Sequence, residues 1–434
     1  MSAPTAVWRR PDWICAESER VKAGLAEQER SWSRGFTRRS FLAGSGMVLA
    51  ASLGSQLVTT RHAYAAEGTG KTLVVIFLRG ALDGLATVVP ANDPNYRAAR
   101  PVIGIPDSQL LQLDATFGLH PSLSPLMPLW NSDKLAFVHS VGARDSNRDH
   151  FASQSIMERG TATLSSSDGW LDRVLAKDGP GTTFRAVCEG PSVVEALKAS
   201  RDAVAMRGID SLTFNNPSAK IADALRTLYT GLDAPVGALM EHTLTAVADS
   251  GPIKGTPKTP QNGARYPANA FGDALADVVR LVRSNCGLRA ATVDLGGWDL
   301  HSEAGTVTAG AQTSHLTELG SALSAYTTDL GTRISDVTTV VISEFGRRVE
   351  QNSSGGTDHG FGGLMMLIGG AVRGGQMHGA WPGLAEADLT SGGDLDIRND
   401  YRDVLGEVAL KALGLGDMSG IFPGYTVDPL GVMR

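Results

Sequence analysis

The sequence has little cysteine. Only 3 of its 434 residues are cysteine, whereas 42% are hydrophobic. A chain of this length and composition can bury a core without disulfide staples. Cys188 and Cys286 remain if the first 65 residues are removed, and they either form one disulfide in an oxidising compartment or stay as two buried thiols.

Positive charge is also scarce. Residues 1–65 hold 9 Lys and Arg and 5 Asp and Glu, which leaves 30 basic and 40 acidic residues in 66–434, a formal balance of −10. No cluster of Lys and Arg offsets this acidic balance. We therefore expect no nucleic-acid partner.

A long, strongly apolar run is missing as well. The most apolar stretch, residues 41–58, is interrupted by glycines and serines, and a membrane-spanning helix needs about 20 apolar residues, so we expect no permanent transmembrane span. Arg38 and Arg39 precede this stretch and an Ala-Tyr-Ala segment follows it at residues 63–65, the order found in export signals. The alternative is a buried core helix.

The two adjacent arginines indicate the export route of this leader. They predict a Tat-type signal peptide and leader over residues 1–65, with the Tat export machinery as a partner. We therefore expect the protein in the periplasm or outside the cell.

After the leader, apolar runs and helical patterns alternate, which is typical of an α/β protein. Expected strands cover residues 72–78, 134–141, 288–295, 338–343 and 364–368; expected helices cover most of 192–250, then 271–282, and 400–413 with Asn399 as its cap. Ligands in open α/β sheets bind beyond the carboxyl ends of the strands. Side chains that follow these strands are therefore candidate site residues.

Carboxylates and imidazoles recur at the expected strand ends. Asp83 follows the first strand, Asp299 and His301 follow the strand at 288–295, and Glu344, Asp358 and His359 follow the strand at 338–343. Oxygen and imidazole ligands suit divalent metal ions. The alternatives are a helix cap for Asp83 and turn chemistry for the Asp358-His359 pair.

His378 lies among glycines shortly after the last expected strand. A lone histidine is more often structural than a ligand. Because it follows the Asp358-His359 pair closely, we count it as a further candidate ligand.

A second candidate segment follows the strand at 134–141. Ser146 or Asn147 is expected to cap a helix that begins near Asp149, which would place Ser146, Asp149 and His150 at a helix N-terminus, a place that suits a nucleophile or a phosphate. Arg148 or Arg347 could neutralise a substrate anion, since arginine offers bidentate donors; the alternative for both is a solvated surface arginine.

Several motifs together resemble a known family. FLRGALDGL, RDHFASQ, GGWDLHSE, SEFGRRVEQNSSGGTDHGFGG and GGQMHG occur in this order behind the Tat-type leader. They are similar to a family of bacterial exported proteins known as a domain of unknown function, usually placed in the alkaline-phosphatase/sulfatase-like superfamily. The resemblance implies a single alkaline-phosphatase-like α/β domain over residues 66–434, in which helices sandwich a central, mostly parallel sheet.

The resemblance also implies a site. Its metal ligands would be Asp83, Asp299, His301, Glu344, Asp358, His359 and His378, and its catalytic segment would hold Ser146, Arg148, Asp149 and His150. Zn²⁺ is favoured by the histidines, with Mn²⁺, Mg²⁺ or Ca²⁺ as other choices.

The expected activity is metal-dependent hydrolysis of a small anionic ester, a phosphate or a sulfate. The alternative is a non-catalytic exported protein, a metal-binding scaffold or partner protein with the same fold. Asp149 supports this alternative, because the corresponding position in the family that the chain resembles is a serine, a candidate nucleophile.

Overall fold

The computed structural model describes residues 70–144, 146–161, 166–200, 203–213, 225 and 234–434. The leader expected over residues 1–65 lies outside this part of the chain. Within the described part, no helix is long and apolar enough to cross a membrane. Cys188 and Cys286 are free thiols, and burial raises the pKa of Cys188 to about 12.

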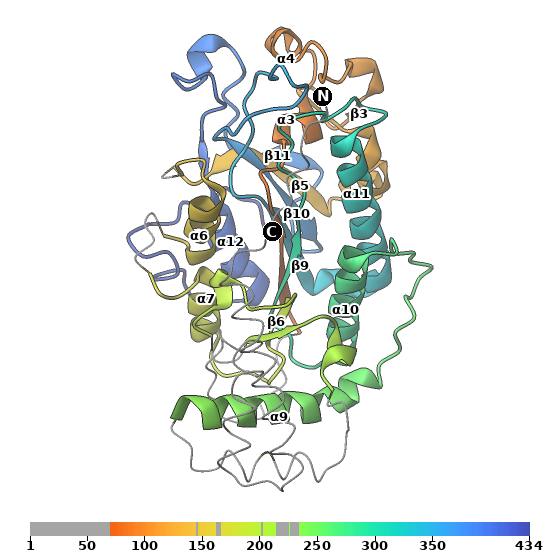
Figure 1. The fold of residues 1–434 in the computed structure, drawn as a ribbon, viewed down its shortest axis with the longest axis vertical. Helices are drawn as coiled ribbons and strands as arrows, with labels where there is room; N and C mark the ends of the chain where they lie inside the picture. Colours follow the sequence, from red (N-terminus) through yellow and green to blue (C-terminus); the bar gives the residue numbers. More distant parts are fainter. Residues whose placement is uncertain (1–69, 145, 162–165, 201–202, 214–224, 226–233) are drawn as a thin grey trace, which may run out of the picture.

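A nine-stranded sheet forms the centre of the molecule (Figure 1). Its path runs β11-β5-β10-β9-β1-β8-β6-β7, and β12 pairs with β5. The strands are β1 Thr72–Leu78, β5 Leu135–Gly142, β6 Ala186–Glu189, β7 Ala203–Met206, β8 Ala290–Leu295, β9 Val337–Ile342, β10 Gly363–Gly369, β11 Gln376–His378 and β12 Asn399–Asp400. All pairings in this sheet are parallel except those of β10, which runs against β5 and β9. The protein is therefore α/β with a mixed, mostly parallel sheet.

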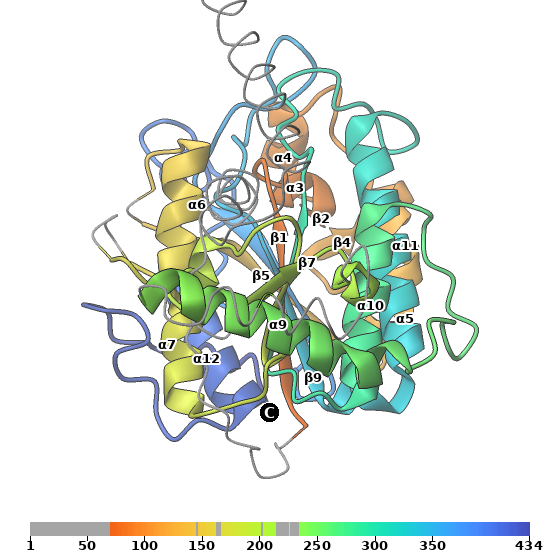
Figure 2. The ribbon, with the colours of Figure 1, turned by 60° about the horizontal axis from the view of Figure 1, so that its bottom comes forward.

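Helices cover both faces of the sheet (Figures 1 and 2). Alternate residues of β1 point to opposite sides, as the period of a strand requires. Val74, Ile76 and Leu78 share a core with α10 (Ala270–Ser284) and α11 (Ala311–Leu330). Leu73, Val75 and Phe77 share the other core with α6 (His150–Arg159), α7 (Trp170–Asp178) and α12 (Tyr401–Leu413).

The remaining elements are shorter or peripheral. α9 (Ala234–Lys254) lies across one end of the molecule (Figure 1). A small antiparallel sheet has the order β2-β4-β3. Its strands are β2 Val88–Pro90, β3 Leu111–Gln112 and β4 Phe117–Leu119. Three short helices come from the same part of the chain: α3 Gly84–Thr87, α4 Pro94–Ala99 and α5 Met127–Asn131. 3₁₀ turns occupy Asp107–Gln109, Pro121–Leu126, Glu195–Leu197, Ile209–Ser211, Gly331–Ser335 and Glu386–Asp388.

Three details of the fold differ from the sequence predictions. The strand expected over residues 364–368 is present as β10, but it is antiparallel to its neighbours. β7 lies in the region expected to be largely helical. Asp400 caps α12 in place of Asn399, accepting a hydrogen bond from the backbone N–H of Arg402.

The fold brings four chain segments to one edge of the sheet. β8, β1 and β9 are adjacent and parallel, so their carboxyl ends meet there, and the antiparallel β10 begins at the same edge. The loops after β1 and β8 touch: Gly80 has φ +114°, and a Cβ on it would lie 2.6 Å from the backbone nitrogen of Asp299. Only glycine permits both this backbone angle and this approach.

Candidate metal centre

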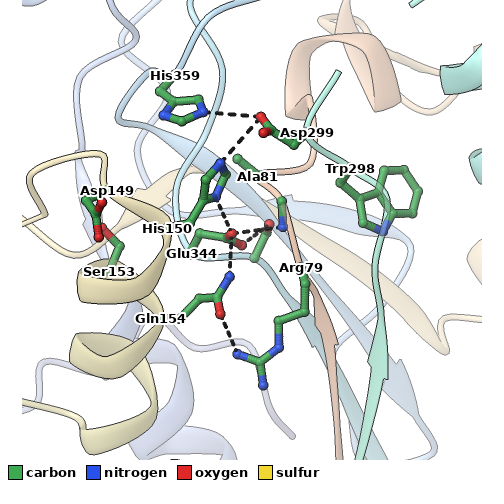
Figure 3. A network of polar contacts seen from close by, with 12 residues as sticks. Arg79, Ala81, Asp149, His150, Ser153, Gln154, Trp298, Asp299, Glu344 and His359 are labelled. Atoms are coloured by element: carbon green, nitrogen blue, oxygen red, sulfur yellow. Dashed lines mark hydrogen bonds and ion pairs between the residues drawn. The ribbon is translucent and has the colours of Figure 1, made fainter. Parts of the chain in front are cut away.

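Three imidazoles converge on one carboxylate oxygen at this edge. His150 begins α6, Asp299 and His301 follow β8, and His359 lies in the loop between β9 and β10. The Nε2 atoms of His150, His301 and His359 lie 3.4, 3.0 and 3.2 Å from Asp299 Oδ1. Figure 3 shows the rings of His150 and His359, each directed toward the carboxylate of Asp299.

The other ring nitrogen of each imidazole is anchored to an acceptor. In the order His150, His301, His359, the Nδ1 atoms lie 2.8 Å from Glu344 Oε1, 3.1 Å from Asp358 Oδ1 and 2.8 Å from the carbonyl oxygen of Arg148. A carboxylate or carbonyl oxygen only accepts, so each Nδ1 must donate. A neutral imidazole then has its lone pair on Nε2, and all three lone pairs face Asp299 Oδ1.

This arrangement calls for a positive charge between the acceptors. His301 Nε2 and His359 Nε2 are 2.9 Å apart, and the buried His150 Nε2 has no hydrogen-bond partner. Acceptors at such distances are held together by a shared proton or by a cation.

The donor set fits a metal ion. Ligand atoms of His150, Asp299 and His359 all lie within 4.8 Å of one another. A tetrahedral zinc ion with bonds of about 2.0–2.1 Å separates its ligands by about 3.3 Å, close to the 3.0–3.4 Å between Asp299 Oδ1 and the three Nε2 atoms. His150, Asp299 and His359 therefore form a possible metal-binding triad, with His301 beside them.

Arg347 holds the loops of the site together. Its guanidinium donates to the carbonyl oxygens of Gly80, Ala81, Trp298 and Thr357 and to Asp299 Oδ1. The side chain is 1% exposed, so it is neither a solvated surface arginine nor a group that reaches a substrate anion. Burial alone would raise the pKa of Asp299, but the hydrogen bond and the positive charge of Arg347 outweigh it and lower that pKa to about 2.

Glu344 is buried in the midst of donors. Its Oε1 accepts from the backbone N–H of Gly80 at 2.8 Å, from Gln154 Nε2 at 2.9 Å and from His150 Nδ1 at 2.8 Å (Figure 3). Burial alone would raise its pKa, yet the hydrogen bonds lower it. Glu344 is therefore an ionised carboxylate placed behind His150.

Two further groups of the site, His359 and Asp358, also have shifted pKa values. Burial lowers the pKa of His359 and so favours its neutral ring. Hydrogen bonds from His301 and Asn352 lower the pKa of Asp358.

Gln154 and Arg79 belong to this network although the sequence analysis did not select them. Gln154 Oε1 accepts from Arg79 Nη1 at 3.2 Å, and Arg79 forms ion pairs with Glu158 at 2.5 Å and Asp294 at 3.0 Å. The signal was present in the spacing: His150, Gln154 and Glu158 are four residues apart and share one face of α6.

Two predicted ligands, Asp83 and His378, lie away from Asp299 and the three imidazoles. Asp83 caps α3, accepting from the Ala86 N–H at 3.0 Å, and its other oxygen pairs with the buried Arg100 at 2.8 Å. The helix-cap alternative therefore describes Asp83. His378 lies on β11 opposite Val138 of β5, and its Nε2 donates to the Arg373 carbonyl oxygen at 2.7 Å.

Of the four predicted catalytic residues, only His150 joins the group. Asp149 caps α6 by accepting from the Ala152 N–H at 2.8 Å, so the prediction of Ser146 or Asn147 as the cap is wrong. Ser146 Oγ is 2.8 Å from Ser153 Oγ. Figure 3 shows Asp149 and Ser153 apart from the imidazoles. Arg148 pairs with Asp394 at 2.9 Å and leaves 39% of its side chain exposed.

Residues 221–417 match the family described as "Protein of unknown function (DUF1501)". The matched range includes Asp299, His301, Glu344, Asp358 and His359, whereas His150 and α6 precede it. No curated protein matches the chain. The chain is thus similar to a family whose description names no activity.

Proposed function

We propose that the protein is an exported metal-dependent hydrolase of small phosphate or sulfate esters. The observation that carries the proposal is the convergence of three Nε2 lone pairs on Asp299 Oδ1, with each Nδ1 anchored by an acceptor. Metal-ligating histidines characteristically donate their other N–H to a carboxylate or a backbone carbonyl. Among Zn²⁺, Mn²⁺, Mg²⁺ and Ca²⁺, this imidazole-rich set favours Zn²⁺.

The residues around the centre have separable tasks. A bound divalent ion polarises an ester oxygen and lowers the pKa of water toward about 7. Arg347 holds Asp299 in place by a hydrogen bond, and Glu344 holds His150 in the same way. Arg148 Nη1 lies 3.5 Å from the carbonyl oxygen of His359, and its partly exposed guanidinium can bind the anionic group of the ester.

The second candidate function is a non-catalytic metal-binding scaffold or partner protein. The observation in its favour is that Ser146 is hydrogen-bonded to Ser153 and Asp149 is occupied as a helix cap. Neither residue offers its side chain to the metal group. Hydrolysis would therefore have to use water as the nucleophile.

The fold and destination belong to the same proposal. Helices on both faces of a mostly parallel sheet, with the candidate ligands beyond the strand ends, support membership of the alkaline-phosphatase/sulfatase-like superfamily. The twin arginine supports export through the Tat machinery to the periplasm or beyond. Changing Arg38 and Arg39 to Lys should leave uncleaved precursor in the cytoplasm, and normal export of that variant would rule the Tat route out.

Metal analysis and ester turnover test the proposal together. We expect the purified protein to bind zinc and to hydrolyse p-nitrophenyl phosphate or p-nitrophenyl sulfate, with loss of both properties in His359→Ala. His378→Ala is the matched control, because it removes an imidazole outside the group and should retain both. Zinc binding without turnover of either ester would favour the scaffold, and absence of any bound Zn²⁺, Mn²⁺, Mg²⁺ or Ca²⁺ would refute both the hydrolase and the metal-binding scaffold.

A further inference from the structure

We infer that Glu344 is not a metal ligand but a positioning residue, which holds His150 with its proton on Nδ1 and its lone pair facing the centre. The inference rests on the proposed metal centre and reverses the role that the family resemblance gives to this glutamate. It also assigns a task to the network of Arg79 and Gln154 behind it.

The Glu344 oxygen that faces His150 is already engaged. Oε1 receives three N–H donors, from Gly80, Gln154 and His150. Oε2 lies 3.0 Å from Ser343 Oγ, a hydroxyl that also lies 2.6 Å from the carbonyl oxygen of Leu78. The side chain is 0% exposed. A metal ion could therefore reach Oε1 only by displacing one of these donors, and the buried carboxylate offers no oxygen to solvent.

The direction of the hydrogen bonds is set from the far end of the network. Arg79 only donates, so the Gln154 oxygen must face it and the Gln154 amide nitrogen must face Glu344. Arg79 is itself fixed by Glu158 and Asp294. The carboxylate of Glu344 is thus pinned between the α6 side chains and the end of β1, and the only role left to His150 Nδ1 is that of a donor.

Asp358 provides an internal comparison. It also accepts from an imidazole Nδ1, that of His301, but its side chain is 54% exposed and that of His301 is 45% exposed. Water can replace an exposed acceptor, whereas nothing replaces a buried one. Loss of the Asp358 charge should therefore disturb the centre less than loss of the Glu344 charge.

The first test measures zinc affinity by competition with a chromophoric chelator. Glu344→Gln should weaken zinc binding about 10–100-fold, the range found for partners of metal-bound histidines, and Asp358→Asn should weaken it less. Asp329→Asn is the structural control: this carboxylate is also buried, 1% exposed, but pairs with Arg283 instead of a histidine of the site. It should lower the melting temperature and leave the zinc affinity unchanged.

The second test reads the tautomer directly. In the metal-free protein at a pH where imidazoles are neutral, ¹⁵N NMR of labelled histidines should show His150 protonated on Nδ1, and Glu344→Leu, which removes the acceptor oxygen, should abolish this preference. His150→Ala assigns the signal. The inference falls if His150 of the unmutated protein carries its proton on Nε2, or if Glu344→Gln binds zinc as tightly as the parent. If the parent binds no zinc, the proposed function fails while the tautomer still decides the role of Glu344.

Discussion

Two glutamates at the same edge of the sheet have opposite surroundings. Glu344 follows β9 and Glu189 ends β6, so both lie at carboxyl ends of parallel strands. Glu344 accepts from two side-chain donors and a backbone N–H. Glu189 accepts from the Gly208 N–H at 3.0 Å and lies beside a second carboxyl group, Asp277, which accepts from the Ile209 N–H.

The comparison shows that position at a strand end does not by itself fix the charge state of a carboxyl group. The donors around Glu344 lower its pKa despite burial. Burial and the neighbouring Asp277 raise the pKa of Glu189 to about 9. One carboxyl group is therefore kept ionised to serve an imidazole, and the other is kept protonated beside its neighbour.

The largest effect on stability should come from replacing Arg347, which links the loops around the candidate metal centre near Glu344. Arg347→Met removes five hydrogen bonds and leaves a buried acceptor array, so the free energy of unfolding should fall by about 3–5 kcal/mol in chemical denaturation. Arg398→Met is the control, because Arg398 and Asp396 form a pair that is 46% and 40% exposed and should contribute less than about 1 kcal/mol. Equal losses in the two variants would show that Arg347 does not organise the site.

Zinc should distinguish the two regions next. A ligand that binds only the folded state at 100 times its Kd raises the free energy of unfolding by about 2.7 kcal/mol. We expect this gain in the parent and in Glu189→Gln, but not in His359→Ala, when unfolding is compared with and without chelator. A zinc gain that survives in His359→Ala, or is lost in Glu189→Gln, would place the ion elsewhere.

The pH dependence of stability tests the Glu189 side of the comparison. The pKa of Glu189 rises from 4.5 in the unfolded chain to about 9 in the fold, so the folded state binds the extra proton. Its contribution to stability is complete below about pH 4.5 and is lost as the pH rises toward about 9. Chelator-treated parent should therefore lose stability relative to Glu189→Gln between pH 5 and pH 9 as measured by urea unfolding. A constant difference across this range would contradict the protonated pair.

Much of the fold could be predicted from local pattern. The runs that became β1, β5, β8 and β9 are short and mostly apolar, and β1 and β9 are also rich in β-branched residues, which is enough to identify buried strands. Direction is not encoded in such a run, because a strand buried on both faces reads the same either way. That is why β10 was placed correctly and its antiparallel pairing was not predicted.

The candidate site was predictable by residue type but not by partner. Asp299, His301, Glu344, Asp358 and His359 could be selected because each follows a strand. Whether a carboxylate faces an ion or an arginine depends on contacts between distant segments. Asp83 meets Arg100 and Asp299 meets Arg347 together with three imidazoles, and no local pattern separates these outcomes. Gln154 was missed because the residue type of a neutral amide suggests no chemistry, although its spacing of four residues from His150 and from Glu158 places the three side chains on one face of α6.

Anomalous diffraction from crystals grown with zinc would test the account most directly. We predict one ion about 2.0–2.1 Å from the Nε2 atoms of His150 and His359 and about 2.0–2.2 Å from an Asp299 carboxylate oxygen. Glu344 should still accept a hydrogen bond from His150 Nδ1. An ion bound directly by Glu344, or an ion bound away from Asp299, would contradict it.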